Sequence, residues 1–193
     1  MNTNPFLRPD LERMADDTLK TLIESGQFTT YPGTLPRLLR QRLKQLKLPR
    51  SDEYLLEDIF AERMIAATQS PSVQEITDQD VHDKVLQASY EKLVMVDVYT
   101  DFCRPCKHVL PVVYQLADKY KDRLTVVKIN AAKNGDFVQA FLGPFQVTPA
   151  FLFFRNGQPL DTSSSRLARV FGQKAHIAST RAGLEKRISV ILA

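Results

Sequence analysis

A short apolar run followed by two closely spaced cysteines is the feature that most constrains the fold of this chain. Residues Leu93–Tyr99 are apolar apart from one carboxylate, Asp97, and have the length of a buried strand. Cys103 and Cys106 follow at the start of a helical pattern over residues 105–120. A second apolar stretch comes after that helix. Strand, helix and strand in this order predict a βαβ unit with parallel strands, and place the cysteines where the first strand gives way to the helix.

The rest of this half of the chain continues to alternate strands and helices. Short apolar runs bounded by turn residues indicate strands, and longer stretches with helical spacing indicate helices. The pair Asn156-Gly157 predicts a hairpin turn between two antiparallel strands. The remaining expected elements are a strand over 73–76, a helix over 77–88 capped by Thr77, a strand over 124–129, a helix over 133–142, a strand over 150–154, a weaker strand ending near Gly172 and a last helix over 179–192.

Three amphipathic helices are expected before this α/β region. Asp10 and Ser51 are suited to cap the first and the third of them. Three short helices bury little apolar surface by themselves, so we expect them to pack on the α/β region, on a second copy of the chain or on another protein. We therefore predict a helical module at residues 1–71 and an α/β domain at residues 72–193. The expected helices cover residues 10–25, 35–48 and 51–67, and Ser70-Pro71-Ser72 is interpreted as the linker.

Composition narrows the class of function. The chain has 193 residues, of which 44% are hydrophobic and 25% charged, which excludes fibrous and wholly disordered proteins. Its net charge of +4 is mild and requires neither nucleic acid nor a membrane as partner. No apolar run approaches the roughly 18 residues that span a bilayer, and the first residues lack the apolar core of a signal peptide. We therefore expect a cytoplasmic protein.

The helix expected over residues 35–48 is strongly basic on one side. Its cations lie largely opposite a stripe of leucines and are Arg37, Arg40, Lys44 and Lys47. One interpretation is a solvated cationic face over an ordinary core stripe. The other is a binding surface, first for an acidic protein, with an anionic membrane or nucleic acid behind it, because no interleaved aromatic row supports nucleic acid.

The cysteine pair has the spacing of a redox site. Two intervening residues let both sulfurs meet across the first helical turn, where free N–H groups and the helix dipole stabilise a thiolate on Cys103. We expect Cys103 to be the nucleophile and Cys106, one turn further in, to keep its proton and then attack the mixed disulfide. The basic side chains of Arg104 and Lys107 should further favour the thiolate. A structural or metal-binding pair is the alternative, although none of the three histidines stands at ligand spacing.

Asp97 is the one carboxylate within the apolar strand. An unpaired buried carboxylate has a raised pKa, which would make Asp97 a proton acceptor for the buried thiol. The alternative is an aspartate at a strand end that is paired with a cation, such as Lys128 on the neighbouring strand.

From about Val73 onward the chain resembles the thioredoxin family. The resemblance rests on the run 96–107, Val-Asp-Val-Tyr-Thr-Asp-Phe-Cys-Arg-Pro-Cys-Lys, and is reinforced by Pro111, by the segments 126–130, 147–149 and 153–157, and by Gly172. It implies an α/β, thioredoxin-like fold, with a central mixed sheet flanked by helices, here preceded by a small all-α N-terminal module. It also implies four catalytic residues, with Cys103 as the attacking thiol, Cys106 as the resolving thiol, Asp97 as the buried acid/base and Lys128 as its neighbour.

The resemblance further implies a substrate-binding surface. A cis peptide bond before Pro149 would turn the backbone of Thr148 toward Cys103, where it can pair with an extended substrate segment. The substrate-binding residues so implied are Phe102, Arg104, Pro105, Thr148, Pro149 and Gly172. Thioredoxins usually have Trp before the first cysteine and Gly after it, so Phe102 and Arg104 alter the docking surface. Pro105 keeps the second intervening position of thioredoxins, which favours a reductant.

The sequence therefore predicts a thiol–disulfide oxidoreductase that reduces protein disulfides through Cys103 and Cys106. Its expected partners are protein disulfides, a thiol electron donor such as a thioredoxin reductase, and a dedicated partner or a second copy bound through the N-terminal helices. No cofactor and no metal is expected. The alternative is a non-enzymatic, thioredoxin-fold scaffold or chaperone-like binding protein whose cysteine pair is regulatory or incidental.

Overall fold

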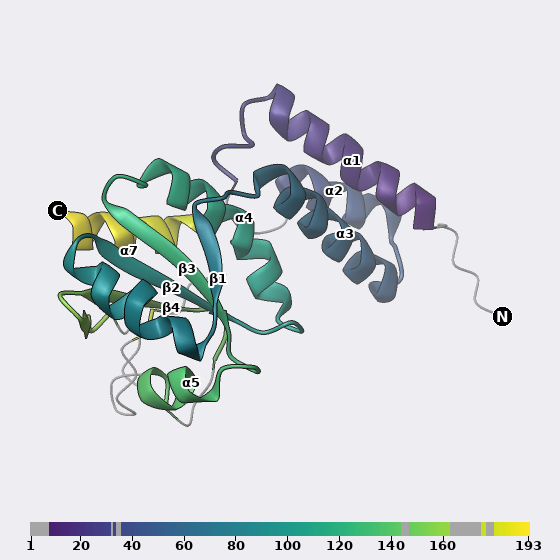
Figure 1. Ribbon diagram of the computed structural model, residues 1–193. Coiled ribbons are helices and arrows are strands. Elements are labelled where there is room, and N and C mark those ends of the chain that lie inside the picture. Colours follow the sequence, from purple (N-terminus) through teal and green to yellow (C-terminus); the bar gives the residue numbers. More distant parts are fainter. Residues whose placement is uncertain (1–7, 32, 34–35, 144–146, 163–174, 177–179) are drawn as a thin grey trace.

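The structure is a computed structural model of the chain that describes residues 8–31, 33, 36–143, 147–162, 175–176 and 180–193. Three N-terminal helices lie beside an α/β part built around one sheet (Figure 1). These helices are α1 (Arg8–Glu24), α2 (Arg37–Leu46) and α3 (Arg50–Thr68). Among the described residues, no helix has both the length and the apolar character needed to cross a membrane.

The sheet of the α/β part is mixed, as predicted. Its five strands run in the order β1-β3-β2-β4-β5. β1 and β2 are both parallel to β3, whereas β4 is antiparallel to β2 and to β5. The βαβ unit is therefore confirmed. The strands are β1 (Val73–Ile76), β2 (Leu93–Tyr99), β3 (Leu124–Asn130), β4 (Ala150–Arg155) and β5 (Gln158–Pro159).

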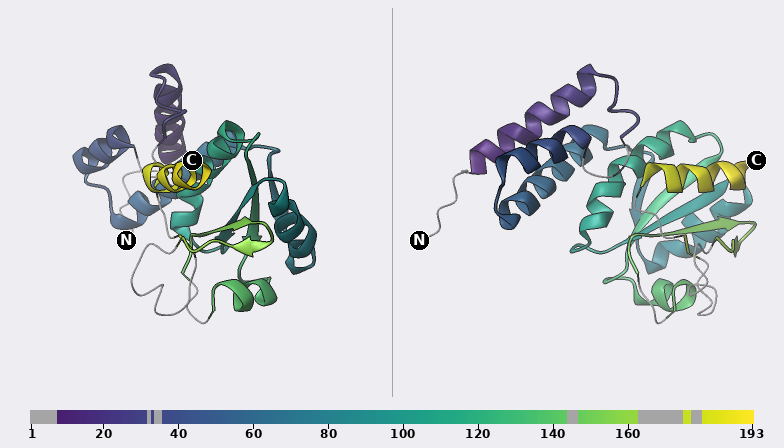
Figure 2. Two further views of the ribbon diagram at one scale, coloured as in Figure 1. Left: turned by 90° about the vertical axis from the view of Figure 1, so that its left-hand side faces the viewer. Right: turned by 180° about the vertical axis from the view of Figure 1, so that it is seen from behind.

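Helices cover both faces of the sheet (Figure 2). One face packs against α4 (Arg104–Lys119) and α7 (Arg181–Leu192). The other packs against α5 (Gly135–Phe141) and against the short helical turns η2 (His82–Gln87) and η3 (Ala88–Tyr90). The turn η1 (Asp78–Asp80) lies against α5.

Alternation along β2 decides which face each side chain joins. Leu93 and Met95 belong to the core under α4, whereas Val94 and Val96 belong to the core on the other side. Because successive strand residues point to opposite faces, Asp97 is on the α4 side, the same side as Met95.

The N-terminal helices pack on the α/β part, which is one of the three arrangements expected from the sequence. α3 lies against α4, and one continuous apolar core joins Phe60 of α3 with Val109 and Val113 of α4. The connection between α1 and α2 is held as well, because Arg181 Nε donates to the carbonyl of Tyr31 at 2.9 Å. The division into separate domains at residue 71 stays a prediction.

Several predicted boundaries are wrong in an instructive way. α1 already includes Arg8 and Pro9, ahead of the expected cap Asp10. α3 begins after Pro49 rather than at Ser51, since the preset φ of proline suits a helix start and no side chain among the described residues caps this helix. After Thr77 the chain forms short 3₁₀ and π turns instead of one α-helix. The Asp80 carboxylate accepts hydrogen bonds from the Thr77 amide and hydroxyl, both at 2.9 Å, which closes a tight first turn.

The second half of the hairpin is shorter than expected. β5 has only two residues, and the rest of the predicted strand, with Gly172, lies largely outside the described residues. The turn itself is confirmed, because Asn156 and Gly157 both have positive φ, of 53° and 73°. This is the combination that a two-residue hairpin turn requires.

We expect Phe60→Ala to lower the free energy of unfolding of the whole protein by about 3–5 kcal/mol, because it removes a fully buried ring from the shared core. The ring also contacts Tyr31, with centroids 6.2 Å apart. Urea unfolding should be followed by far-UV circular dichroism and by tyrosine fluorescence, since the chain has no Trp. One transition that shifts equally by both probes is the expected result; a shift confined to a separate first transition would contradict a shared core.

Candidate active site

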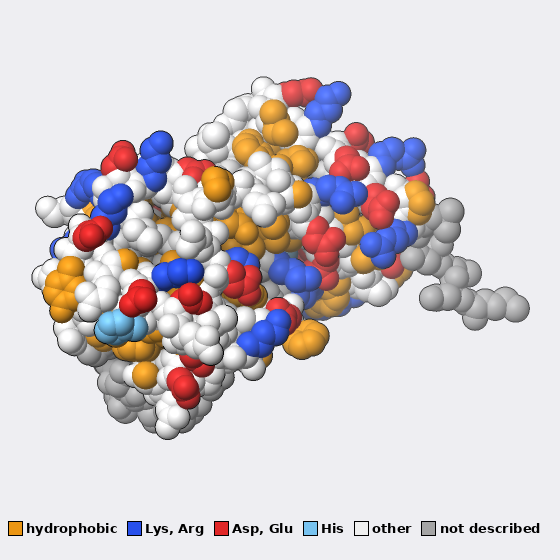
Figure 3. Space-filling model, in the orientation of Figure 1, with side chains coloured by type: hydrophobic (Ala, Val, Ile, Leu, Met, Phe, Trp, Pro, Cys, Tyr) orange, Lys and Arg blue, Asp and Glu red, His pale blue; other side chains and the backbone are white. Residues whose placement is uncertain are grey.

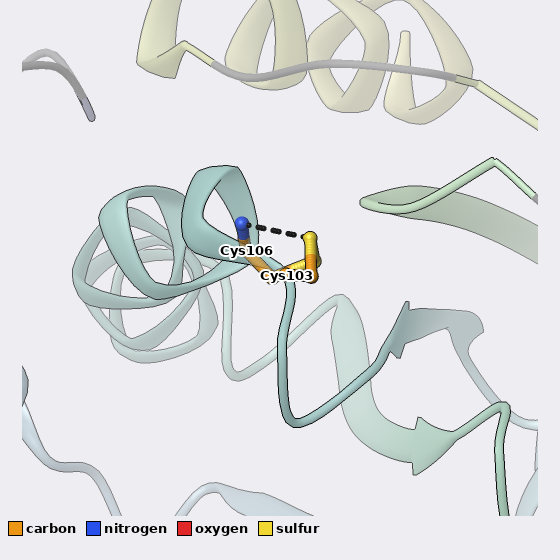
Figure 4. The surroundings of a disulfide bond; sticks show 2 residues. All are labelled: Cys103 and Cys106. Carbon is orange, nitrogen blue, oxygen red and sulfur yellow. Dashed lines mark hydrogen bonds between the residues drawn. A yellow bond between two sulfur atoms is a disulfide. The ribbon is translucent and has the colours of Figure 1, made fainter.

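The two cysteines form a disulfide at the N-terminus of α4, with Cα atoms 5.2 Å apart (Figure 4). Cys103 occupies the N-cap position, and its sulfur accepts a hydrogen bond from the Cys106 amide at 3.2 Å. Pro105 lies within the first turn, where the missing N–H costs no helical hydrogen bond. Both cysteines are buried. The positive end of a long helix therefore points at the sulfur that the sequence predicts to be the nucleophile.

The surroundings of the pair include an exposed aromatic ring. Phe102 is 96% exposed, although large apolar side chains are usually at least partly covered. The Thr148–Pro149 peptide bond is cis, as the resemblance implied. Because Ala150 pairs with Val98, Pro149 lies at the end of β4 beside the end of β2, from which the chain runs to Cys103.

A row of polar side chains crosses three neighbouring strands on the α4 face. In the strand register Asp97 of β2 stands opposite Lys128 of β3, which stands opposite Glu75 of β1. Lys128 Nζ forms an ion pair with Glu75 Oε2 at 2.7 Å. The Tyr99 hydroxyl donates to Glu75 Oε1 at 2.6 Å. The cation expected beside Asp97 is thus present, but its direct ion pair is with Glu75.

Asp97 shares a cavity with the second cysteine. The cavity has a volume of about 170 Å³, and its lining includes Asp97, Cys106, Lys128 and Leu110. Asp97 is only 2% exposed, and its Oδ1 has no hydrogen-bond partner among the described residues. Burial raises its pKa to about 7, against the opposing effect of the positive charge of Lys128. A carboxylate with such a pKa can accept and return a proton at neutral pH.

Arg104 differs from its expected arrangement. The sequence placed its charge beside the nucleophile, whereas the structure turns its guanidinium onto α3. Nε donates to Asp58 Oδ1 at 2.9 Å, and an amino group donates to Glu57 Oε2 at 3.2 Å and to the Tyr54 carbonyl at 2.7 Å. The guanidinium carbon also lies 4.3 Å from the centroid of the Tyr54 ring. Tyr54, Glu57 and Asp58 had no local signal in the sequence, because they lie 46 to 50 residues before Arg104.

The structure describes all but one of the predicted site residues. Cys106, Asp97 and Lys128 line one cavity, and the disulfide joins Cys103, at the N-cap of α4, to Cys106. Phe102, Arg104 and Pro105 adjoin the cysteines in the sequence. Gly172 lies outside the described residues. Over the part of the chain that the structure describes, no group of three or more His, Cys, Asp or Glu side chains could hold a metal ion.

Comparisons with known proteins agree with this geometry. The thioredoxin family model matches residues 72–173. Thioredoxin-T of Drosophila melanogaster is 30% identical over 122 residues, which cover 61% of this chain and 76% of that protein. Thioredoxin 1 of Synechococcus elongatus is 33% identical over 87 residues, 45% of this chain and 78% of that protein. The solved structure of Malassezia sympodialis thioredoxin matches 63% of this chain and 94% of its own, with a TM-score of 0.50 and 24% identity. The chain therefore belongs to the thioredoxin family of thiol–disulfide oxidoreductases.

Proposed function

We propose that this protein reduces protein disulfides by dithiol–disulfide exchange through Cys103 and Cys106. The observation that carries the proposal is the shared placement of the pair and of Asp97. Cys103 caps the N-terminus of α4, and Cys106 lines the same cavity as a buried carboxylate whose pKa is about 7. This arrangement supports one thiol as nucleophile and the other as a thiol that needs help to lose its proton.

The proposed reaction has two exchange steps. The Cys103 thiolate attacks one sulfur of the substrate disulfide, so that a mixed disulfide forms and the other substrate sulfur leaves as a thiolate and takes up a proton. Asp97 then accepts the Cys106 proton, and the Cys106 thiolate attacks Cys103 and releases the second substrate thiol. Two electrons pass to the substrate, and the enzyme is left as the disulfide seen in the structure. A thiol donor, such as a thioredoxin reductase, restores the dithiol, and no cofactor or metal is needed.

The reduction potential tests the direction of this reaction. Equilibration of the pair in glutathione or dithiothreitol buffers should give a reduction potential of about −270 mV, the value of thioredoxin. The reduced protein should also reduce insulin disulfides. A value of about −120 to −180 mV would instead indicate an oxidase or isomerase. Failure to cycle between dithiol and disulfide would reject the proposal in favour of a non-enzymatic scaffold or chaperone-like protein.

We expect Phe102→Ala to raise the KM for a protein disulfide by about 3–10-fold, because a protein substrate would cover the exposed ring on docking. Turnover of a small disulfide such as oxidised glutathione should stay within about twofold of wild type, because so small a substrate covers little of the ring. Steady-state kinetics with both substrates provide the check. Equal losses on both substrates would show that Phe102 acts on the cysteines rather than on docking.

The N-terminal helices are proposed to influence which partners bind. Arg37, Arg40 and Lys44 lie on the exposed face of α2 and line a hollow of about 370 Å³. Within the described parts of the chain, none of these three cations has an ion pair with a carboxylate. Such a face suits an acidic protein surface. Charge reversal of the three residues should weaken substrate capture without changing small-disulfide turnover, and sedimentation equilibrium should report whether a homodimer forms.

A disulfide reductant fits a reducing compartment, so we propose a cytoplasmic location, which cell fractionation tests.

A further inference from the structure

The N-terminal module reaches into the redox motif itself through α3. We propose that Glu57 and Asp58 hold the Arg104 side chain on α3, and thereby withhold its positive charge from Cys103 and keep the cysteine pair strongly reducing. This inference rests on the proposed thiol–disulfide exchange and names a device that regulates it. Glu57 and Asp58 are positioning residues here, since they act through Arg104.

The contacts of Arg104 hold its guanidinium in a defined place. The planar guanidinium donates hydrogen bonds to two carboxylates and to a backbone carbonyl. Several donors of the rigid group are therefore satisfied at once. The ring of Tyr54 covers one face of the same group. The side chains of Arg104, Glu57 and Asp58 are each only about one third exposed, at 33%, 29% and 33%, so water screens these ion pairs less than it screens surface pairs. Acidic and basic side chains lie intermixed over the N-terminal helices and over the α/β part (Figure 3).

The ion-paired group formed by Arg104, Glu57 and Asp58 has no surplus of positive charge. One guanidinium stands between two carboxylates, so this group of three residues has a formal charge of −1. His108 of α4 is a titratable group whose pKa responds to both Arg104 and Asp58. Burial lowers the pKa of His108, and the charges of Arg104 and Lys107 lower it further, against the opposing effect of Asp58. His108 is therefore mainly neutral at pH 7 and does not replace the charge that α3 holds.

An unpaired Arg104 would change the relative stability of the dithiol and the disulfide. A guanidinium one residue after Cys103 would stabilise the thiolate of the reduced form and leave the disulfide unchanged. Stabilising the reduced form makes a dithiol a poorer electron donor. By pairing Arg104 with Glu57 and Asp58, α3 removes this stabilisation. The arrangement also explains how a bulky cation beside the nucleophile is compatible with a reductant.

The test compares the double variant Glu57→Gln/Asp58→Asn with wild type in two measurements. The pH profile of Cys103 alkylation by iodoacetamide should move down by about 0.5–1 pH unit, because Arg104 is released toward the thiolate. The equilibrium constant for forming the intramolecular disulfide from oxidised glutathione should fall by about 3–10-fold. The matched control is Glu24→Gln/Glu62→Gln, which removes two exposed carboxylates from the same module and should leave both values unchanged.

A second background separates the position of Arg104 from the direct effect of losing negative charge. In Arg104→Gln there is no guanidinium to release, so adding the Glu57 and Asp58 changes should shift the alkylation profile by less than half as much. An absence of any shift in the double variant would overturn the inference. An equal shift with and without Arg104 would overturn it as well.

The proposed function fails by a different result. Both measurements use only the protein, a small alkylating reagent and glutathione. A pair that titrates and equilibrates as expected but does not reduce insulin would reject the reductase and leave the role of α3 standing. If the protein reduced insulin but the Glu57 and Asp58 substitutions had no effect, the reductase would stand and the role of α3 would be rejected.

Discussion

Cys103→Ser should lose disulfide reduction by more than about 10³-fold, because a serine hydroxyl at neutral pH is not ionised and cannot replace a thiolate as nucleophile. The helix N-terminus that favours a thiolate at this position does not compensate for the absence of sulfur. Turnover of insulin and of oxidised glutathione should be lost together, since both reactions begin with the same attack.

The partner substitution, Cys106→Ser, should behave differently. Cys103 can still attack, but no second thiol resolves the product, so the protein should accumulate as a covalent mixed disulfide with its substrate. Non-reducing gels and intact-mass spectrometry detect this species, and dithiothreitol should reduce it and release the substrate. If Cys103→Ser formed the mixed disulfide and Cys106→Ser did not, the two roles would be exchanged.

The second large effect is expected for Asp97→Asn, which should slow the resolving step by about 10²-fold at pH 7. The carboxylate in the shared cavity is the group placed to take the Cys106 proton, and an amide cannot accept it. The difference from wild type should shrink at higher pH, where hydroxide removes the proton directly. Single-turnover release of substrate from a preformed mixed disulfide measures this step.

The same substitution should stabilise the protein at neutral and higher pH. The folded pKa of Asp97 is about 7, raised from 3.8 by burial, so between these values the unfolded chain has lost a proton that the folded chain still holds. The free energy of unfolding of the wild type therefore falls as pH rises from about 4 to 7, by about 4 kcal/mol in all, and is level above that. Asp97→Asn avoids this loss, but burying an amide without hydrogen-bond partners costs about 1–3 kcal/mol. The variant should therefore be more stable than wild type by about 1–3 kcal/mol at pH 8.

Urea unfolding at pH 4 and pH 8 distinguishes this account from a general packing effect. The gain of Asp97→Asn should be present at pH 8 and absent at pH 4. At pH 4 Asp97 is protonated in the folded protein and only about half ionised in the unfolded chain, so the difference in proton binding has cost the wild type little stability. Asp101→Asn is the matched control, because Asp101 lines the same cavity but is half-exposed and pairs with Lys133. Asp101→Asn should change neither the resolving step nor the pH dependence. A stability gain for Asp97→Asn of equal size at both pH values would contradict a carboxylate with a raised pKa.

The elements that carry the chemistry were open to prediction because their signals are local. Strand β2 follows from an unbroken apolar run, and the start of α4 follows from two cysteines and a proline at the head of a helical pattern. The burial of Asp97 follows from its place within that run. The Asn156-Gly157 turn follows from residues that tolerate positive φ. Helix ends were less accurate, since proline, rather than the expected Ser51, precedes the first turn of α3.

The sequence by itself therefore determined the class of fold and the residues with chemical potential, since periodicity, turn chemistry and close cysteine spacing act within a few residues. Only the tertiary structure decided how those residues are paired. Lys128 joins Glu75 because strand register aligns them across the sheet, and Arg104 joins Asp58 because α3 packs on α4. An ion pair between distant segments depends on distances that exist only after packing, so the partners of Arg104 and Lys128 are set by contacts that no local pattern contains.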